Sequence, residues 1–142
     1  MSNVFNRKLK ILVLFLVGGF VYGMMEILSR GYSHISMFCA GGLCLVLIDY
    51  CNHKLPSHIA VVSKLFIFSG IITLIEFVIG ILVNQILHLG VWDYSHLPYN
   101  LLGQICLIYF IVWFLVSFMV LMADEYICRY WFGEHREKIK FF

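Results

Sequence analysis

LFIFSGIITLIEFVIGILVNQIL, residues 65–87, contains a single formal charge, the carboxylate of Glu76, close to its middle. A helix of this length spans the roughly 30 Å hydrocarbon core of a bilayer. An ionised carboxylate at that depth costs about 3 kcal/mol on insertion scales, so its side of the helix should face protein or water rather than lipid. The segment therefore predicts a transmembrane helix that packs inside a membrane protein.

Polar and small residues recur along this segment with helical spacing. Ser69, Thr73, Glu76, Gly80 and Asn84 follow one another at steps of four, three, four and four. These steps place all five on one helical face, while Leu, Ile, Val and Phe fill the remaining positions. We expect the rest of the chain to pack around this polar face.

The composition of the whole chain is that of a membrane protein. Its 142 residues are 62% hydrophobic and 13% charged, with a mean hydropathy of +0.92, whereas about a quarter of the residues in soluble domains are charged. The net charge of +2 and the lack of a long basic run argue against nucleic-acid binding. The five cysteines have neither the spacing of a zinc site nor that of a disulfide framework, so we expect small buried side chains.

The apolar runs predict an all-α integral membrane fold, a bundle of four transmembrane helices. The expected spans cover about residues 11–29, 35–50, 62–87 and 101–123, so residues 1–123 form one membrane domain. The longest connection, 88–100, carries aromatic residues of the kind found at membrane interfaces. Residues 124–142 mix both signs of charge with aromatic residues, and we expect them to continue as a helix into an amphipathic cytoplasmic tail, with Gly133 as a break.

The first apolar run has a second interpretation. A basic start followed by an apolar run is also typical of a signal peptide. This run is long, however, contains Glu26, and leads into Ser29-Arg30-Gly31 rather than into a small-residue cleavage pattern. We therefore interpret it as a retained span.

The basic residues predict the orientation. With both termini in the cytoplasm, nine of the ten lysines and arginines lie on the cytoplasmic side, and Arg30 alone lies outside. Because basic residues concentrate in cytoplasmic loops, we expect a multi-pass protein of the plasma membrane with cytoplasmic N- and C-termini.

Two segments of the chain resemble each other. Residues 32–45, YSHISMFCAGGLCL, and residues 94–107, YSHLPYNLLGQICL, share Tyr-Ser-His, a glycine and Cys-Leu at an offset of sixty-two positions. Each follows a run with one glutamate, Glu26 or Glu76. The pattern predicts a parallel repeat of two helix pairs, with a chance match in this biased composition as the alternative.

Three stretches resemble a known family. They are YGMMEILSRGYSHISMFCAGGLC, IEFVIGILVN and VWDYSHLPYNLLGQICL, and the similarity covers about residues 19–114. They are similar to the small bacterial membrane proteins of the "Putative ABC-transporter type IV" family, which implies a permease-like transport role. The chain has no GxxxxGK[ST] loop, so ATP hydrolysis would need a separate subunit.

Glu76 is the first candidate site residue. A carboxylate within a membrane is a functional candidate because its burial is costly, and here it would bind a proton or a cation beside Thr73 or Asn84. The alternative is a hydrogen-bonded glutamate that ties helices together. Further polar residues toward the outer leaflet complete a candidate ligand or ion pocket, open to the outside: Asn84, Glu26, Asn100, Gln104, Thr73, His34, Asp93 and His96.

Several of these residues also have structural interpretations. Glu26 and Arg30 have the i,i+4 spacing of an ion pair. Asn100 is a possible N-cap of the fourth span, and Gln104 could bond across helices.

Neither catalytic nor metal-binding residues are predicted. Asp93 and His96 could form an orienter and a base, but no nucleophile motif accompanies them, and a hydrogen-bonded turn explains them more simply. The four residues that could meet as a metal site on the cytoplasmic side follow no ligand spacing: Cys51, His53, His58 and Cys128. No cofactor is indicated.

These features favour a membrane transport component with an outward-opening polar pocket. We expect a homo-oligomer or a larger membrane partner, including a separate ATPase. One alternative is a membrane enzyme that acts on a lipid or lipid-linked head group. The other is a non-catalytic helper of another membrane protein.

Overall fold

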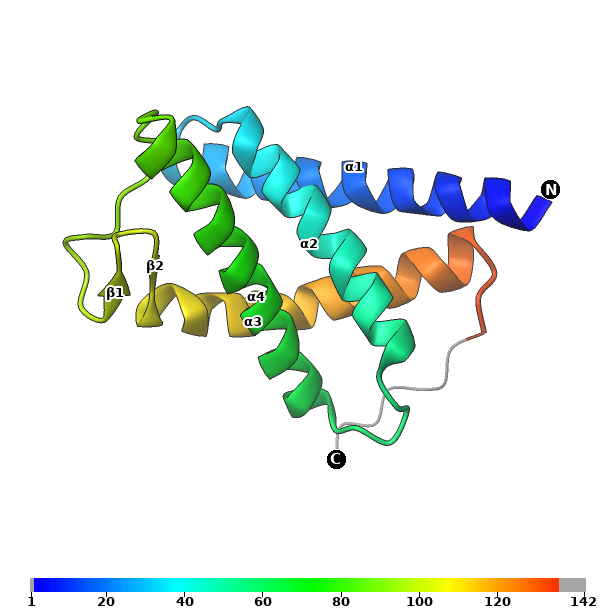
Figure 1. Ribbon diagram of the computed structural model, residues 1–142. Helices are drawn as coiled ribbons and strands as arrows, with labels where there is room; N and C mark the ends of the chain where they lie inside the picture. The colour runs from blue at the N-terminus through cyan, green and yellow to red at the C-terminus, as the bar shows by residue number, and fades with distance from the viewer. Residues whose placement is uncertain (1, 136–142) are drawn as a thin grey trace.

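The computed structural model describes residues 2–135 of the chain (Figure 1). Within that part the elements are α1 Ser2–Arg30, α2 Ile35–Lys54, α3 Val61–Gly80, β1 Asn100–Leu101, β2 Ile105–Cys106 and α4 Leu107–Tyr126. Short π-helical segments extend α3 over Ile81–Ile86 and α4 over Ile127–Trp131. Apart from the small antiparallel ladder of β1 and β2, the regular structure of this part is helical.

Four helices of the described part are long and apolar enough to cross a membrane. They cover Phe5–Arg30, Ile35–Lys54, Val61–Ile86 and Leu107–Trp131. The set of four apolar helices expected from the sequence is therefore confirmed.

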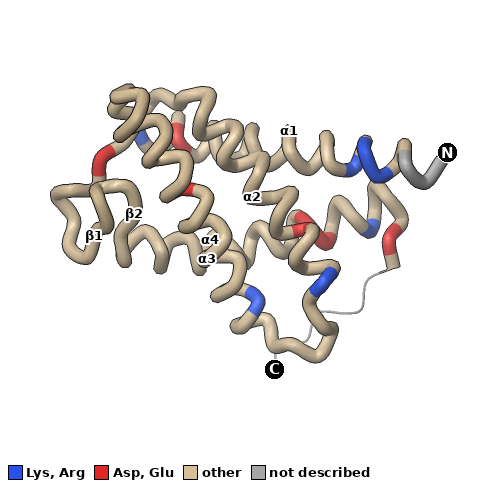
Figure 2. Tube along the Cα trace, in the orientation of Figure 1, with Lys and Arg blue, Asp and Glu red and all other residues tan. Residues whose placement is uncertain are grey.

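The helices alternate in direction, so the bundle has two ends (Figure 1). We call one the basic end: α1 and α3 begin there, and α2 and α4 finish there. We call the other the loop end, which holds the α1–α2 turn and the segment 87–106. Figure 2 shows that charged residues gather near these two ends and are sparse between them. This distribution is typical of helices whose middle parts lie in hydrocarbon.

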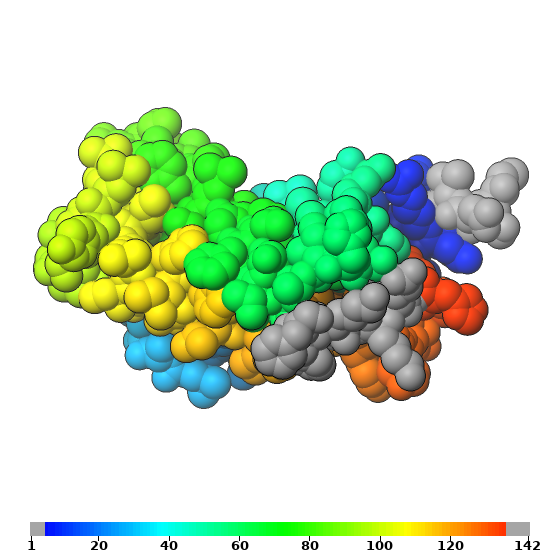
Figure 3. All heavy atoms as spheres, turned by 90° about the horizontal axis from the view of Figure 1, so that it is seen from below, coloured from blue at the N-terminus to red at the C-terminus, as the bar shows by residue number. Residues whose placement is uncertain are grey.

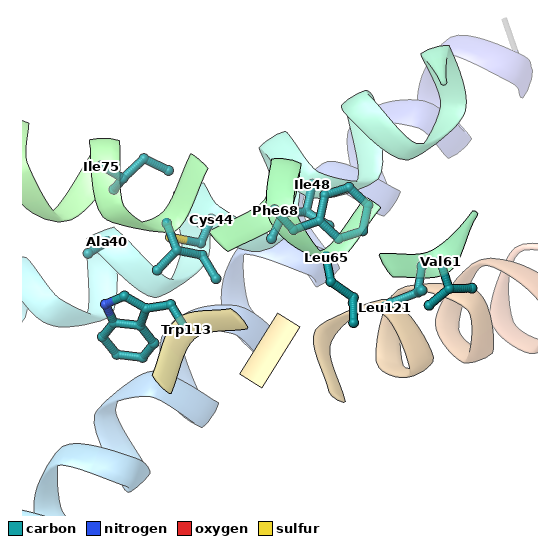
Figure 4. Packing of buried hydrophobic residues seen from close by; sticks show 10 residues of the cluster. Ala40, Cys44, Ile48, Val61, Leu65, Phe68, Ile75, Trp113 and Leu121 are labelled. Carbon is teal, nitrogen blue, oxygen red and sulfur yellow. The ribbon is translucent and has the colours of Figure 1, made fainter. Parts of the chain in front are cut away.

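The main core forms where α3 packs between α2 and α4 (Figure 4). Phe68 of α3, Ile48 of α2 and Leu121 of α4 are completely buried there. This packing turns the polar face of α3 inward, so Ser69 is 0% and Glu76 is 4% exposed. The expectation that this face meets protein is confirmed.

Close packing of α1 on α2 depends on glycine. A Cβ atom added at Gly18 would lie 2.4 Å from the carbonyl oxygen of Gly41, and one at Gly41 would lie 2.5 Å from that of Gly18. No other residue fits at such a distance without displacing a backbone. Small residues allow this approach in a membrane, where contact distance rather than water exclusion holds helices together.

The fourth helix begins later than we predicted from the apolar run. Residues 101–106 belong to the loop end, and α4 starts at Leu107 with Cys106 at its N-cap, so Asn100 does not cap it. Leu102 and Gly103 have positive φ angles of 52° and 68°, which interrupt a helix at this point. Because α4 starts late, the two similar segments take different positions relative to the helix that follows each of them. His34 caps α2 directly, whereas His96 lies in the loop well before α4.

At its other end the fourth helix continues beyond the predicted end of the span at Ala123, as expected for the start of the tail. It continues through the π-helical segment to Trp131, and Gly133 follows with a φ angle of 64°. The expected break at this glycine is thus found. The rest of the predicted tail, residues 136–142, lies outside the described residues.

Candidate functional site

Glu76 is held inside the bundle by two neutral donors. Tyr94 Oη donates to its Oε1 at 2.9 Å, and Trp113 Nε1 donates to its Oε2 at 2.9 Å. Tyr94 belongs to the segment 87–106 and Trp113 to α4, so the carboxylate connects α3 to both. Figure 3 shows that this segment, in yellow-green, packs directly against α3 and the start of α4.

Aromatic stacking fixes both donors in place. The Trp113 ring stacks on Tyr22 of α1 with centroids 5.6 Å apart, and the Tyr94 ring stacks on Tyr109 of α4 with centroids 4.4 Å apart. Burial and the negative charge of Glu76 raise the pKa of Tyr94 above its ordinary value. Its hydroxyl therefore remains a donor at physiological pH.

Glu76 has no basic partner within residues 2–135. None of the ion pairs formed there includes its carboxylate. The narrow space beside it, bordered by Tyr22, Ile72 and Trp92 among others, does not admit a water molecule. Glu76 is thus a buried carboxylate that has no basic partner among the described residues and is held by two hydrogen bonds.

Asn84 and Gln104 form a second polar contact between α3 and the loop end. Asn84 Nδ2 donates to Gln104 Oε1 at 2.8 Å, and Asn84 Oδ1 accepts the backbone N–H of Val91 at 2.6 Å. Trp92 Nε1 donates to the Gln104 carbonyl at 3.0 Å. Gly80 makes room for this contact, because a Cβ atom there would lie 2.6 Å from Gln104 Oε1. Gln104 thus bonds to the extension of α3 from the loop, whereas its structural interpretation placed it on the fourth helix.

Asp93 and Asn100 stabilise the segment 87–106 through hydrogen bonds to its own backbone. Asp93 Oδ1 accepts the backbone N–H of Ser95 at 2.8 Å, and this bond holds the pKa of the exposed carboxyl below its ordinary value. Asn100 Nδ2 donates to the Leu97 carbonyl at 2.7 Å, and its Oδ1 accepts the N–H of Gly103 at 3.1 Å. Asp93 thus makes the turn contact of its structural interpretation, whereas Asn100 makes turn contacts in place of the N-cap that was its structural interpretation.

Glu26 and His34 also have local partners at the loop end. Glu26 forms the predicted ion pair with Arg30, whose Nη1 also donates to the Val91 carbonyl at 3.0 Å. His34 Nδ1 accepts the backbone N–H of Ser36 at 3.2 Å and so caps α2.

Within the described residues, the side chains of Thr73 and His96 form neither a hydrogen bond nor an ion pair. The Thr73 hydroxyl, one turn before Glu76 on α3, is buried and has no hydrogen-bond partner among the described residues. The His96 side chain is exposed on the segment 87–106. The nine predicted residues therefore fall into separate contact groups, and of the nine only Glu76 lines the narrow space described above.

A charged cluster at the basic end went unrecognised in the sequence. Lys10 Nζ lies 2.9 Å from Asp49 Oδ1 and 2.7 Å from Glu134 Oε1, and His53 Nε2 lies 2.9 Å from Glu134 Oε2. These residues come from α1, α2 and the segment after α4. Lys10 and Asp49 are far apart in sequence, so no local spacing predicts their ion pair. The signal that could have found it is that they carry opposite charges at the same expected membrane depth on successive helices.

A second set of bonds extends this cluster to α3. Lys64 Nζ donates to Asn52 Oδ1 at 3.1 Å, and Asn52 Nδ2 donates to Asp124 Oδ2 at 3.0 Å. Together the two sets join all four helices at the basic end.

Part of the cluster has the composition of a metal site. Asp49, Cys128 and Glu134 place one donor atom each within 4.8 Å of one another. Cys128 Sγ donates to Asp49 Oδ1 at 3.3 Å, and the ammonium of Lys10 contacts both carboxylates. The lysine thus supplies the positive charge that a metal ion would otherwise bring, and we assign no metal here.

Four apolar helices with charged residues gathered at their ends define a multi-pass helical membrane protein. A family model matches residues 33–142, and the chain belongs to the family described as "Putative ABC-transporter type IV". The family resemblance inferred from the sequence motifs is confirmed, and it associates the chain with ABC transporters. No curated protein and no solved structure matches the chain.

Proposed function

We propose that the chain is a permease-like component of a membrane transport system in which Glu76 binds a proton or a small cation. The family assignment supports the transport context. Because the chain has no phosphate-binding GxxxxGK[ST] loop, ATP hydrolysis would come from a separate subunit.

The observation that carries this role is the isolation of the Glu76 carboxylate. A buried carboxylate without a counter-charge costs several kcal/mol in a low-dielectric medium. Hydrogen bonds to a charged group return about 1.5–3 kcal/mol each, and Glu76 has one from Tyr94 and one from Trp113. A proton or cation would neutralise the carboxylate without breaking an ion pair, which suits a group that binds and releases one.

Access to Glu76 would come through the loop end. Tyr94 is part of the segment 87–106, so movement of that segment would break one hydrogen bond and uncover the carboxylate. Thr73, Asn84 and Gln104 would then border the pocket. The remaining predicted residues would lie at its rim: Glu26, His34, Asp93, His96 and Asn100.

The proposed assembly is a homo-oligomer or a complex with a larger membrane partner, together with an ATPase. Four helices that leave no space for water beside Glu76 are too few to enclose an aqueous path alone. We place the protein in the plasma membrane with the basic end in the cytoplasm, because cytoplasmic loops are rich in lysine and arginine.

The test is purification of the native complex from the host membranes, followed by mass determination and by ATP hydrolysis measured from acidic to alkaline pH. We expect an ATPase in the wild-type complex and activity that follows the protonation of Glu76. Glu76→Gln should assemble to the same mass, since its amide can still bond Tyr94 and Trp113, but should lose the pH dependence. Glu76→Asp retains a carboxylate and should keep part of it.

Two results would contradict the proposal. A chain that purifies without any ATPase would exclude ATP-driven transport. An unchanged pH profile in Glu76→Gln would remove Glu76 from the mechanism.

A further inference from the structure

We propose that a cleft at the basic end binds the head group of an anionic phospholipid. The cleft has a volume of about 910 Å³ and lies between the start of α1, the last turns of α2 and the residues that follow α4. This inference concerns a different end of the bundle from Glu76 and does not depend on the proposed transport role.

The charges around the cleft favour an anion. Its lining includes three basic side chains, Arg7, Lys10 and Lys54, and two carboxylates, Asp49 and Glu134. Lys10 contacts both carboxylates, and within the described part of the chain neither Arg7 nor Lys54 forms an ion pair. Lys54 lies over the Tyr50 ring, with its Nζ 5.8 Å from the ring centroid, and both Lys54 and Arg7 are exposed. A phosphate can therefore approach both side chains, and arginine and lysine both bind phosphate well.

The cleft has a fixed polar floor. Lys10 is only 7% exposed, and its ammonium is bonded to carboxylates from α2 and from the segment after α4. Since Lys10 is already bonded to two carboxylates, an anion would interact with the two basic side chains at the opening.

The walls of the cleft favour a lipid over a soluble phosphate. Leu9 and Ile11 of α1 and Leu47 of α2 line it and are 42%, 43% and 41% exposed. Tyr50 and Trp131, also in the lining, are 55% and 59% exposed, and such aromatic residues settle at head-group depth. In a phospholipid the phosphate is joined to apolar acyl chains, so the basic side chains would bind the phosphate and the apolar wall would contact the acyl chains.

The test is a titration of the delipidated full-length protein in detergent with phosphatidylglycerol, phosphatidylcholine or inorganic phosphate, with bound ligand counted by native mass spectrometry. We expect the wild type to bind phosphatidylglycerol more tightly than phosphatidylcholine. Each basic side chain near an anionic surface is worth about fivefold in affinity, so Arg7→Gln with Lys54→Gln should weaken binding about 25-fold. The lipid-independent unfolding temperature should not change, since both side chains are exposed.

Lys8 offers a matched control. It is exposed on α1 next to Arg7 but does not line the cleft, so Lys8→Gln removes the same charge from the same helix. We expect its affinity for phosphatidylglycerol to stay within about twofold of the wild type. Exchange of the two basic types, Arg7→Lys with Lys54→Arg, should also preserve binding.

Three results would overturn the proposal. Equal weakening by Lys8→Gln would mean general attraction to a basic surface. Equal binding of phosphatidylcholine would remove the need for a negative head group. Inorganic phosphate that binds as tightly as phosphatidylglycerol would identify a soluble anion as the occupant.

Discussion

Glu76 receives its hydrogen bonds from a phenol and an indole, and neither of these groups carries a positive charge. An arginine or lysine in the same place would lock the carboxylate in its ionised form, whereas the two aromatic donors allow it to be charged or neutral. Tyr94 remains protonated because burial and Glu76 itself raise its pKa. The chemistry of the site therefore depends on the carboxylate alone.

Tyr94→Phe should destabilise the protein. The substitution keeps the ring that stacks on Tyr109 but removes the hydroxyl that donates to Glu76. Loss of one hydrogen bond to a buried charged acceptor costs about 2 kcal/mol, measurable by reversible denaturant unfolding in detergent.

Tyr99→Phe is the control for that measurement. Tyr99 is 82% exposed in the same segment, so its loss should change stability by less than about 0.5 kcal/mol. Equal stabilities of the two variants would show that the Tyr94 hydroxyl contributes nothing.

At the residue scale, the sequence predicts burial better than it predicts partners. The position of Glu76 within residues 65–87 indicates an enclosed carboxylate, because lipid excludes charge. Its donors lie 18 and 37 positions further along the chain, where a tyrosine and a tryptophan look like ordinary interfacial or apolar residues. The same holds for Lys10 and Asp49, each of which marks the end of an apolar run when considered alone.

Among the elements, α1 and α2 have the closest contact, and glycine sets its distance. The backbone of α1 at Gly18 lies against that of α2 at Gly41, so even a methyl group has no space. The packing of this pair is therefore less tolerant of substitution than that of α3, where longer side chains interdigitate with both neighbours.

Gly41→Ala should separate α1 from α2 and lower the free energy of unfolding by about 1–3 kcal/mol, the usual cost of overpacking. Gly70→Ala on α3 is the matched control, because a Cβ atom there meets nothing within 4 Å. Denaturant unfolding of both variants in the same detergent measures the difference. A Gly41→Ala protein as stable as Gly70→Ala would show that the helices shift apart at no cost.

The elements themselves were predictable from apolar length, but the start of α4 was not. Residues 101–106 continue the apolar composition of α4, which is why a helix was expected from Leu101. The backbone instead turns at Leu102 and Gly103, and the side chain of Asn100 bonds that turn. Local polar hydrogen bonds therefore determine where α4 begins, and a hydropathy pattern does not reveal such bonds.

For the molecule as a whole, the charges define two unlike ends, and this asymmetry predicts its orientation. We expect Tyr99→Cys, at the loop end, to react with a membrane-impermeant maleimide in intact cells. Lys8→Cys, at the basic end, should react only after permeabilisation. The unsubstituted chain reports the background from its five cysteines. The reverse labelling pattern would invert the proposed topology.

The parallel repeat remains a prediction at this scale. The first Tyr-Ser-His segment leads straight into α2, where His34 is the cap, while the second lies in the loop that covers Glu76. If the halves arose by duplication, the two Tyr-Ser-His segments have since acquired different structural roles.

The two donors of Glu76 also impose an order on biosynthesis. When α3 first emerges from the ribosome, neither Tyr94 nor Trp113 has followed it out, since they lie 18 and 37 positions further along the chain than Glu76. The carboxylate then has none of its final donors, and α3 alone is a poor substrate for lateral release into lipid. Arrival of α4 completes both bonds, so α3 and α4 should leave the insertion machinery together, as a hairpin.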